Sequence, residues 1–149
     1  MVRKELQLNE RMSVVQGQWR LAYVWMVGAG ISFLVLLGQT MRHVYGSQYA
    51  KAWSWFLPTV VPILTLIVGS LAYQAKASED GATVDRRMYL VSMVFSAFYL
   101  LLVLGVLAST AFQAQDLPLE RMSQSQLWLA PVQALTTTAL GAFFVSKKQ

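Results

Sequence analysis

The stretch Met88–Gln115, with the sequence MYLVSMVFSAFYLLLVLGVLASTAFQAQ, contains no Lys, Arg, Asp or Glu. About twenty apolar helical residues are needed to cross a hydrocarbon core of about 30 Å. The chain has further uncharged stretches of this length at Leu21–Met41, Ala52–Ala75 and Met122–Ser146. The pattern therefore predicts an all-α integral membrane protein, a bundle of four transmembrane helices at about residues 21–41, 53–73, 88–108 and 126–146.

Little of the chain is left outside these spans. The sequence has 149 residues, so the spans leave a head over residues 1–20, short loops and a short tail, and a single membrane domain over 1–149 is expected. In the head, Leu8, Met12, Val15 and Trp19 recur at helical spacing, which predicts an amphipathic helix. Such a helix would either lie on the membrane surface or continue the first span.

The basic residues are unevenly distributed between the two sides of the predicted bundle. Of the 12 Lys and Arg residues, nine lie in the head, the loop 76–87 and the tail, and three lie in the other two loops. The positive-inside rule then predicts that both termini and the loop 76–87 are cytoplasmic, in a multi-pass protein of the inner or plasma membrane. Lipid headgroups account for the net charge of +5, so no nucleic-acid partner is expected.

The sequence lacks the residues with which most membrane enzymes and cofactor proteins work. It has no Cys, a single His and no charged residue in the middle of a span. This composition argues against thiolate metal sites, paired haem ligands and proton-coupled transport, so we expect no catalytic residue, no metal and no cofactor. A lipid- or quinone-modifying enzyme is the weakest alternative; it would use His43, Tyr45, Asp116 or Glu120 at the outer surface, but their spacing does not support it.

The fourth span differs from the others because small and polar side chains occupy its middle. Gln133, Thr136, Thr137 and Thr138 occupy its middle, and one helical face carries Ala130, Gln133, Ala134, Thr137 and Gly141. An amide such as that of Gln133 is costly against lipid, so this face is predicted either to pack against another helix or to line a pore.

Gly28 and Gly30 lie near the middle of the first span. Small residues allow helices to approach closely in lipid, so this pair is predicted either to pack against a neighbouring helix or to contribute to a pore wall.

Prolines and tryptophans mark the second and fourth spans. Pro62 and Pro131 are predicted to kink these helices, because proline removes one helical hydrogen bond. Trp53, Trp55 and Trp128 lie near the outer starts of the same spans, where an aromatic belt is expected at the membrane interface.

Taken together, these features predict a small non-catalytic membrane protein that forms a homo-oligomeric pore or channel, or acts as a membrane-permeabilising effector. The alternative is an anchor or accessory subunit of a larger membrane complex. The expected partners are the lipid bilayer, further copies of the chain, and a cytoplasmic protein that would bind through residues 1–20 and 76–87.

Overall fold

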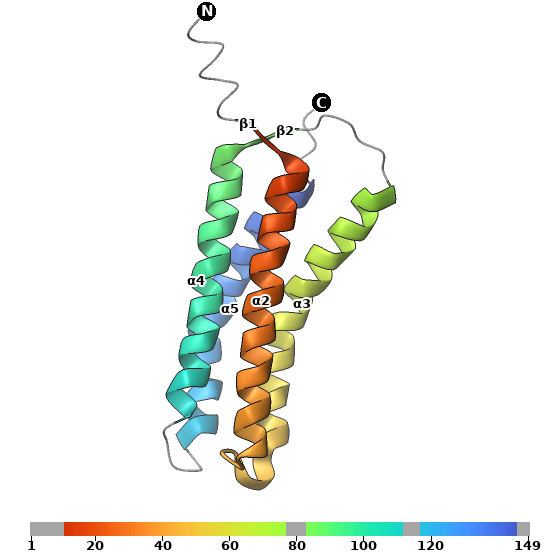
Figure 1. Ribbon diagram of the computed structural model, residues 1–149. Coiled ribbons are helices and arrows are strands. Elements are labelled where there is room, and N and C mark those ends of the chain that lie inside the picture. Colours follow the sequence, from red (N-terminus) through yellow and green to blue (C-terminus); the bar gives the residue numbers. More distant parts are fainter. Residues whose placement is uncertain (1–10, 77–82, 112–116, 146–149) are drawn as a thin grey trace, which may run out of the picture.

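The computed structural model describes residues 11–76, 83–111 and 117–145. Four long helices dominate it: α2 (Val14–Met41), α3 (Tyr49–Lys76), α4 (Arg86–Thr110) and α5 (Leu117–Val145) (Figure 1). Each is long and apolar enough to cross a membrane. The prediction of a helical protein with four helices long and apolar enough to span a membrane is confirmed, and these helices indicate a membrane protein.

The helices form a four-membered bundle in which neighbours in the chain run in opposite directions (Figure 1). α2 packs mainly on α3 and α4, and α5 packs on the same two helices, so α2 and α5 lie diagonally opposite each other. α2 and α4 begin at one end of the bundle, close to Arg20, Arg86 and Arg87; we call this the basic end. The opposite end, where the connection 42–48 lies, α4 ends at Thr110 and α5 begins at Leu117, is the far end.

The helices extend beyond the predicted spans. α2 begins at Val14 and not near Leu21, and α5 begins at Leu117, well before the expected start near residue 126. The start of α5 suits its sequence, because Pro118 lies in the first turn, where proline removes no helical hydrogen bond. Glu120 then accepts a 3.1 Å hydrogen bond from Gln124 one turn later. The length of an uncharged stretch predicts only the part of a helix that fits the hydrocarbon core. The helix itself continues past that part with polar residues.

The head does not form the predicted helix throughout. Strand β1 (Arg11–Ser13) pairs antiparallel with β2 (Thr83–Asp85), and Met12 lies opposite Val84. The prediction of a helical face through Met12 is therefore wrong, whereas residues 14–20 do continue the first span as part of α2. Leu8 lies outside the described residues. The strand pair joins the starts of α2 and α4, which are neighbours in the bundle.

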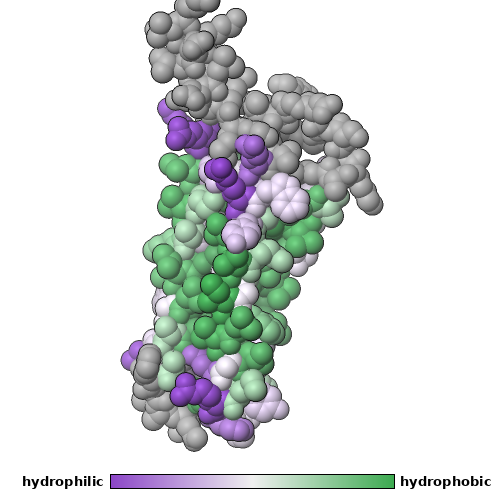
Figure 2. Space-filling view, viewed as in Figure 1, coloured by the Kyte–Doolittle hydropathy of each residue, from purple (hydrophilic) through white to green (hydrophobic). Residues whose placement is uncertain are grey.

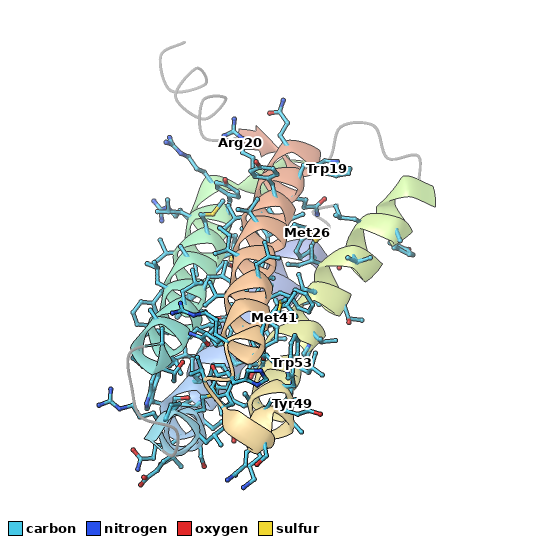
Figure 3. All side chains as sticks on the ribbon, turned by 60° about the horizontal axis from the view of Figure 1, so that its bottom comes forward. Trp19, Arg20, Met26, Met41, Tyr49 and Trp53 are labelled. Atoms are coloured by element: carbon cyan, nitrogen blue, oxygen red, sulfur yellow. The ribbon has the colours of Figure 1, made fainter. Side chains whose placement is uncertain are left out.

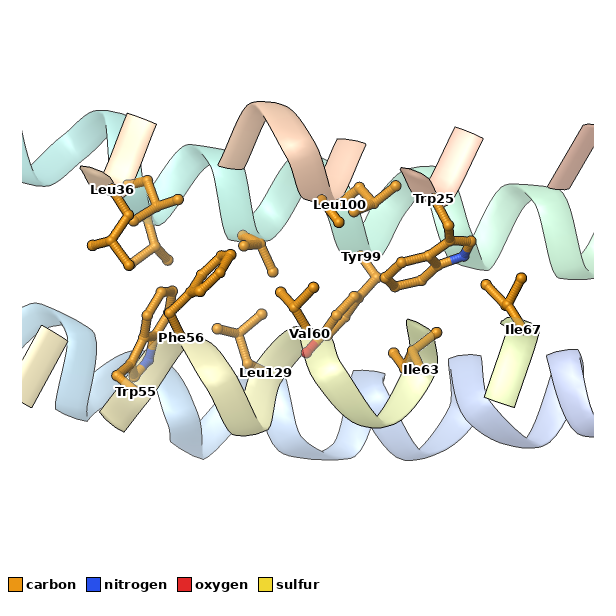
Figure 4. Packing of buried hydrophobic residues seen from close by; sticks show 14 of the residues in the cluster. Trp25, Leu36, Trp55, Phe56, Val60, Ile63, Ile67, Tyr99, Leu100 and Leu129 are labelled. Atoms are coloured by element: carbon orange, nitrogen blue, oxygen red, sulfur yellow. The ribbon is translucent and has the colours of Figure 1, made fainter. Parts of the chain in front are cut away.

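Aromatic and aliphatic side chains fill the centre of the bundle, as Figure 4 shows for Trp25, Phe56, Ile63 and Tyr99. The outer surface is also apolar, and a hydrophobic band separates the polar residues at the two ends (Figure 2). Such a surface suits contact with lipid and not with water. In Figure 3, the side chains of Trp19 and Arg20 lie at the basic end, whereas Tyr49 lies near the far end.

Candidate functional site: polar contacts between the helices

The middle of α3 contains a carbonyl group that its own helix leaves without a donor. Pro62 has no N–H, so it cannot donate to the Pro58 carbonyl four residues earlier. The side-chain amide of Gln133 in α5 donates to this oxygen instead, at 3.0 Å. Figure 1 shows α3 changing direction near its middle. Membrane helices tolerate proline where a neighbouring helix supplies such a replacement bond.

A second bond fixes the same turn of α3 from the other side. The hydroxyl of Tyr99 in α4 donates to the Thr59 carbonyl at 2.9 Å, across the core of the bundle. The Thr59 hydroxyl donates in turn to the Trp55 carbonyl at 2.6 Å. The proline turn is therefore held by α4 and α5 together.

The three predicted belt tryptophans have different surroundings. Trp55 is only 3% exposed, and its indole N–H donates to the Ser125 hydroxyl of α5 at 3.1 Å. It is thus a core residue that joins α3 to α5, because the helix face it occupies also carries Phe56 and Thr59 towards the interior. Trp53 packs edge-on against Phe33, with ring centroids 5.3 Å apart.

Trp128 is 43% exposed. For Trp128 and the half-buried Trp53, a position at the membrane interface stays a prediction.

At the far end, a buried polar cluster joins α2, α4 and the connection between α2 and α3. The Gln39 amide donates to the Leu107 carbonyl at 2.7 Å, and the Tyr45 hydroxyl donates to the Gln39 side-chain oxygen. Thr110 lies 3.4 Å from the Tyr45 hydroxyl. Burial raises the pKa of the Tyr45 phenol, and the hydrogen bond with Thr110 lowers it by less. The cluster ties the far ends of the helices together.

The polar and small residues in the middle of the fourth span have different surroundings in the structure. Thr136 is fully buried and its hydroxyl donates to the Val132 carbonyl of its own helix at 2.8 Å, whereas Gln133 turns towards α3. Thr137 and Gly141 are half-buried, and a Cβ atom at Gly141 would meet nothing within 4 Å.

On the same helix, Ala130 and Ala134 are exposed, and Pro131 lies within the helix on the exposed side.

The two glycines of the first span also differ. A Cβ atom at Gly28 would lie 2.6 Å from Leu100 Cδ1, so this glycine permits a close approach of α2 and α4. A Cβ atom at Gly30 would meet nothing within 4 Å, and that position is exposed.

The basic-end half of the core contains polar groups that lack a partner. Within the described part of the chain, no hydrogen bond is made by either amide atom of Gln18, by the Trp25 indole nitrogen or by the Ser96 hydroxyl, although all are buried. These residues were not singled out from the sequence. A signal was present, because Gln18, Trp25, Ser32 and Gln39 recur at every seventh position of α2, and all are buried.

The structure does not bring the suggested enzyme residues together into a catalytic group. His43 is exposed with a positive φ of 56°, Tyr45 is buried in the far-end cluster, and Glu120 contacts Gln124. Asp116 lies outside the described residues. In the ranges 11–76, 83–111 and 117–145, no three His, Cys, Asp or Glu residues are grouped in a way that could hold a metal ion.

No protein-family model, curated protein or solved structure matches this chain.

Proposed function

We propose that the protein is a non-catalytic membrane protein that self-associates through α5, and that the oligomer forms a pore or a permeabilising path across the membrane. The proposal is supported by α5, whose exposure and hydropathy do not fit a helix surrounded by lipid alone. Within the most apolar 18-residue segment of each span, the segment of α5 has the smallest share of buried residues and the lowest mean hydropathy. A segment that faces lipid should be strongly apolar, so the surface of this part of α5 suits contact with protein better than contact with lipid.

The outward side of α5 has the composition of a helix-packing face. Ala130, Ala134, Thr138 and Ala142 recur at every fourth position and are all exposed. The Thr138 hydroxyl donates to the Ala134 carbonyl at 2.8 Å, which leaves a shallow, nearly apolar surface. Small residues at this spacing let two helix backbones approach closely.

Beside this strip of small residues, α5 exposes the large side chains of Leu127, Trp128 and Leu135, whereas the outward sides of α2 and α4 carry bulky side chains along most of their length. The exposed large residues there include Met26, Leu34, Val94, Phe98 and Leu101. These side chains suit the irregular, fluid surface of lipid. The contrast selects α5, and not α2 or α4, as the helix that meets a second copy.

A path for ions or small solutes would then lie between copies. The interior of the described bundle is occupied by aromatic and aliphatic side chains, and Gln133 and Thr136 form their hydrogen bonds within one copy. These two residues are therefore poor candidates for the lining of a path. Thr137, Thr138 and Gly141, on or next to the outward side of α5, are better candidates.

The proposal is tested by ion flux from liposomes that contain the purified protein. Replacing Ala134 with Leu places a bulky side chain on the small-residue face, and we expect both flux and oligomer mass in native detergent to fall. Ala108→Leu makes the same change at an exposed position of α4 and should leave both unchanged. A monomeric wild-type protein, or flux that is equally insensitive to both substitutions, would reject the proposal.

A further inference from the structure

Three buried side chains with unpaired polar atoms lie along one region of the core. Gln18 and Trp25 are 1% and 0% exposed on α2, and Ser96 is 0% exposed on α4. Among the described residues, no partner is found for two donor nitrogens, those of the Gln18 amide and the Trp25 indole, or for one acceptor, the Gln18 amide oxygen. The Ser96 hydroxyl, which can donate or accept, also has none. Leaving such groups unpaired in a protein interior is costly, so each normally has a partner.

The packing of α2 on α4 places Trp25 and Ser96 at the same level. Gly28 and Leu100 are in contact, and the two helices run in the same direction. Trp25 lies three residues before Gly28, and Ser96 lies four residues before Leu100, so their backbones differ by about one residue along the bundle axis. Gln18 lies two helical turns nearer the basic end on the same face of α2.

Ser96 is unusual among the hydroxyl residues of the spans. Ordinarily a serine or threonine within a helix can donate to the carbonyl four residues earlier. Ser32, Thr59, Ser70 and Thr136 do so at distances from 2.6 to 2.8 Å. The Ser96 hydroxyl forms neither this local bond nor any other hydrogen bond among the described residues.

The basic-end half of the core is less completely enclosed by α3. Figure 1 shows α3 leaning away from α2 beyond its bend, and no residue from Val68 to Tyr73 is buried. Figure 4 shows the Trp25 indole nitrogen on the side of Ile67, the last buried residue of α3 before this stretch. The N–H thus points towards the basic end and not towards Tyr99.

We propose that water enters each protomer from the basic end and is held there by Gln18, Trp25 and Ser96. Water is the ligand that suits this set, because it can accept from the indole, donate to the amide oxygen and do either with the hydroxyl. Because Gln18 lies two helical turns from Trp25, more than one water molecule is needed to reach all three side chains, and a buried water commonly makes about three hydrogen bonds. The hydrated site ends at Tyr99, because the Tyr99 ring packs on Trp25 with centroids 6.0 Å apart and its hydroxyl is bound to Thr59. This site lies within one copy and does not depend on oligomerisation.

The chain contains its own control for the test. Trp25 and Trp55 are both buried tryptophans, but only Trp55 donates to a protein partner. Radiolytic hydroxyl-radical labelling of the full-length protein in lipid nanodiscs oxidises side chains that lie next to water. Mass spectrometry should show that Trp25 is oxidised at a rate close to that of Trp19, which is 62% exposed, and that Trp55 remains almost unlabelled.

A double substitution tests whether Gln18 and Ser96 hold the water. In Gln18→Leu/Ser96→Ala, the labelling of Trp25 should fall towards that of Trp55, while the labelling of Trp19 stays the same. The proposal is overturned if wild-type Trp25 is as protected as Trp55, or if Trp25 is labelled equally in the wild type and the double variant. The wild-type comparison stands by itself if the double variant does not fold.

Discussion

The two ends of the core differ in how their buried polar groups are paired, and two glutamines on one helix show the difference. Gln39, at the far end of α2, donates to Leu107 and accepts from Tyr45. Gln18, near the basic end of the same helix, is also buried but has no partner among the described residues. The far end is therefore closed by hydrogen bonds between segments, whereas the basic end is held by the β1–β2 pair and apolar packing.

The turn around Pro62 separates these two regions. Before this turn, Trp55 donates a hydrogen bond to Ser125, and Thr59 donates one to the Trp55 carbonyl. After the turn, α3 leans away from α2 (Figure 1). Gln133 and Tyr99 hold the turn itself. If α3 moves relative to the bundle, we expect its basic-end half to move and its far-end half to stay fixed.

The largest effect is expected from breaking the far-end cluster. Gln39→Leu leaves the Tyr45 hydroxyl and the Leu107 carbonyl without their partner, and we expect a loss of about 2 kcal/mol in the free energy of unfolding. Gln18→Leu breaks no bond to the protein and should change that free energy little. Unfolding in mixed micelles of sodium dodecyl sulfate measures both, and equal losses would remove the distinction between the two ends.

A smaller effect is expected at the proline turn. Gln133→Leu removes the donor to the Pro58 carbonyl and should cost about 1 kcal/mol. In a Pro62→Ala background, the new backbone N–H at position 62 can bond to the same carbonyl, so the loss of Gln133 should matter less. A double-mutant cycle measures this coupling. Additive effects of the two substitutions would show that Gln133 does not compensate for Pro62.

The glycine pair in α2 tests the close contact with α4. Gly28→Ala brings a methyl group against Leu100, whereas Gly30→Ala enters open space and gains helix propensity. Because the end of the leucine side chain can shift, we expect Gly28→Ala to be less stable than Gly30→Ala by only about 1 kcal/mol. The same unfolding assay measures this difference, and a Gly28→Ala variant as stable as Gly30→Ala would contradict the close packing.

The smallest effect concerns pH at the far end. Burial raises the pKa of Tyr45 in the folded protein above that of an unfolded chain, where a tyrosine titrates near 10. The stabilisation is therefore complete below about pH 10 and is lost as the pH rises through the folded-state value. Tyr45→Phe should flatten this alkaline decline. Unfolding curves at several alkaline pH values measure it.

The spans could be predicted from the sequence because the exclusion of charge from the hydrocarbon core is a local property. The pairing of polar groups could not, because it depends on tertiary contacts. Pro62 alone implies that the Pro58 carbonyl lacks a helical donor, but the sequence does not show that Gln133, on another helix, supplies one. Trp55 has the same sequence context as a belt tryptophan, and only the position of Ser125 shows that it faces the interior.

The head shows a second limit of sequence analysis. Its apolar residues recur with a helical period, yet residues 11–13 pair with the connection 83–85. The starts of α2 and α4 lie side by side, so backbone pairing between the segments before them competes with local helix formation. A pattern within one segment does not contain that information.

Disulfide crosslinking between copies tests the central claim, association through α5, most directly. The chain has no cysteine, so Ala134→Cys and Leu101→Cys each introduce a single thiol, at exposed positions of α5 and α4. Oxidation in native membranes should link Ala134→Cys into dimers and leave Leu101→Cys monomeric. Dimers of Leu101→Cys with none of Ala134→Cys, or monomers of both, would contradict association through α5.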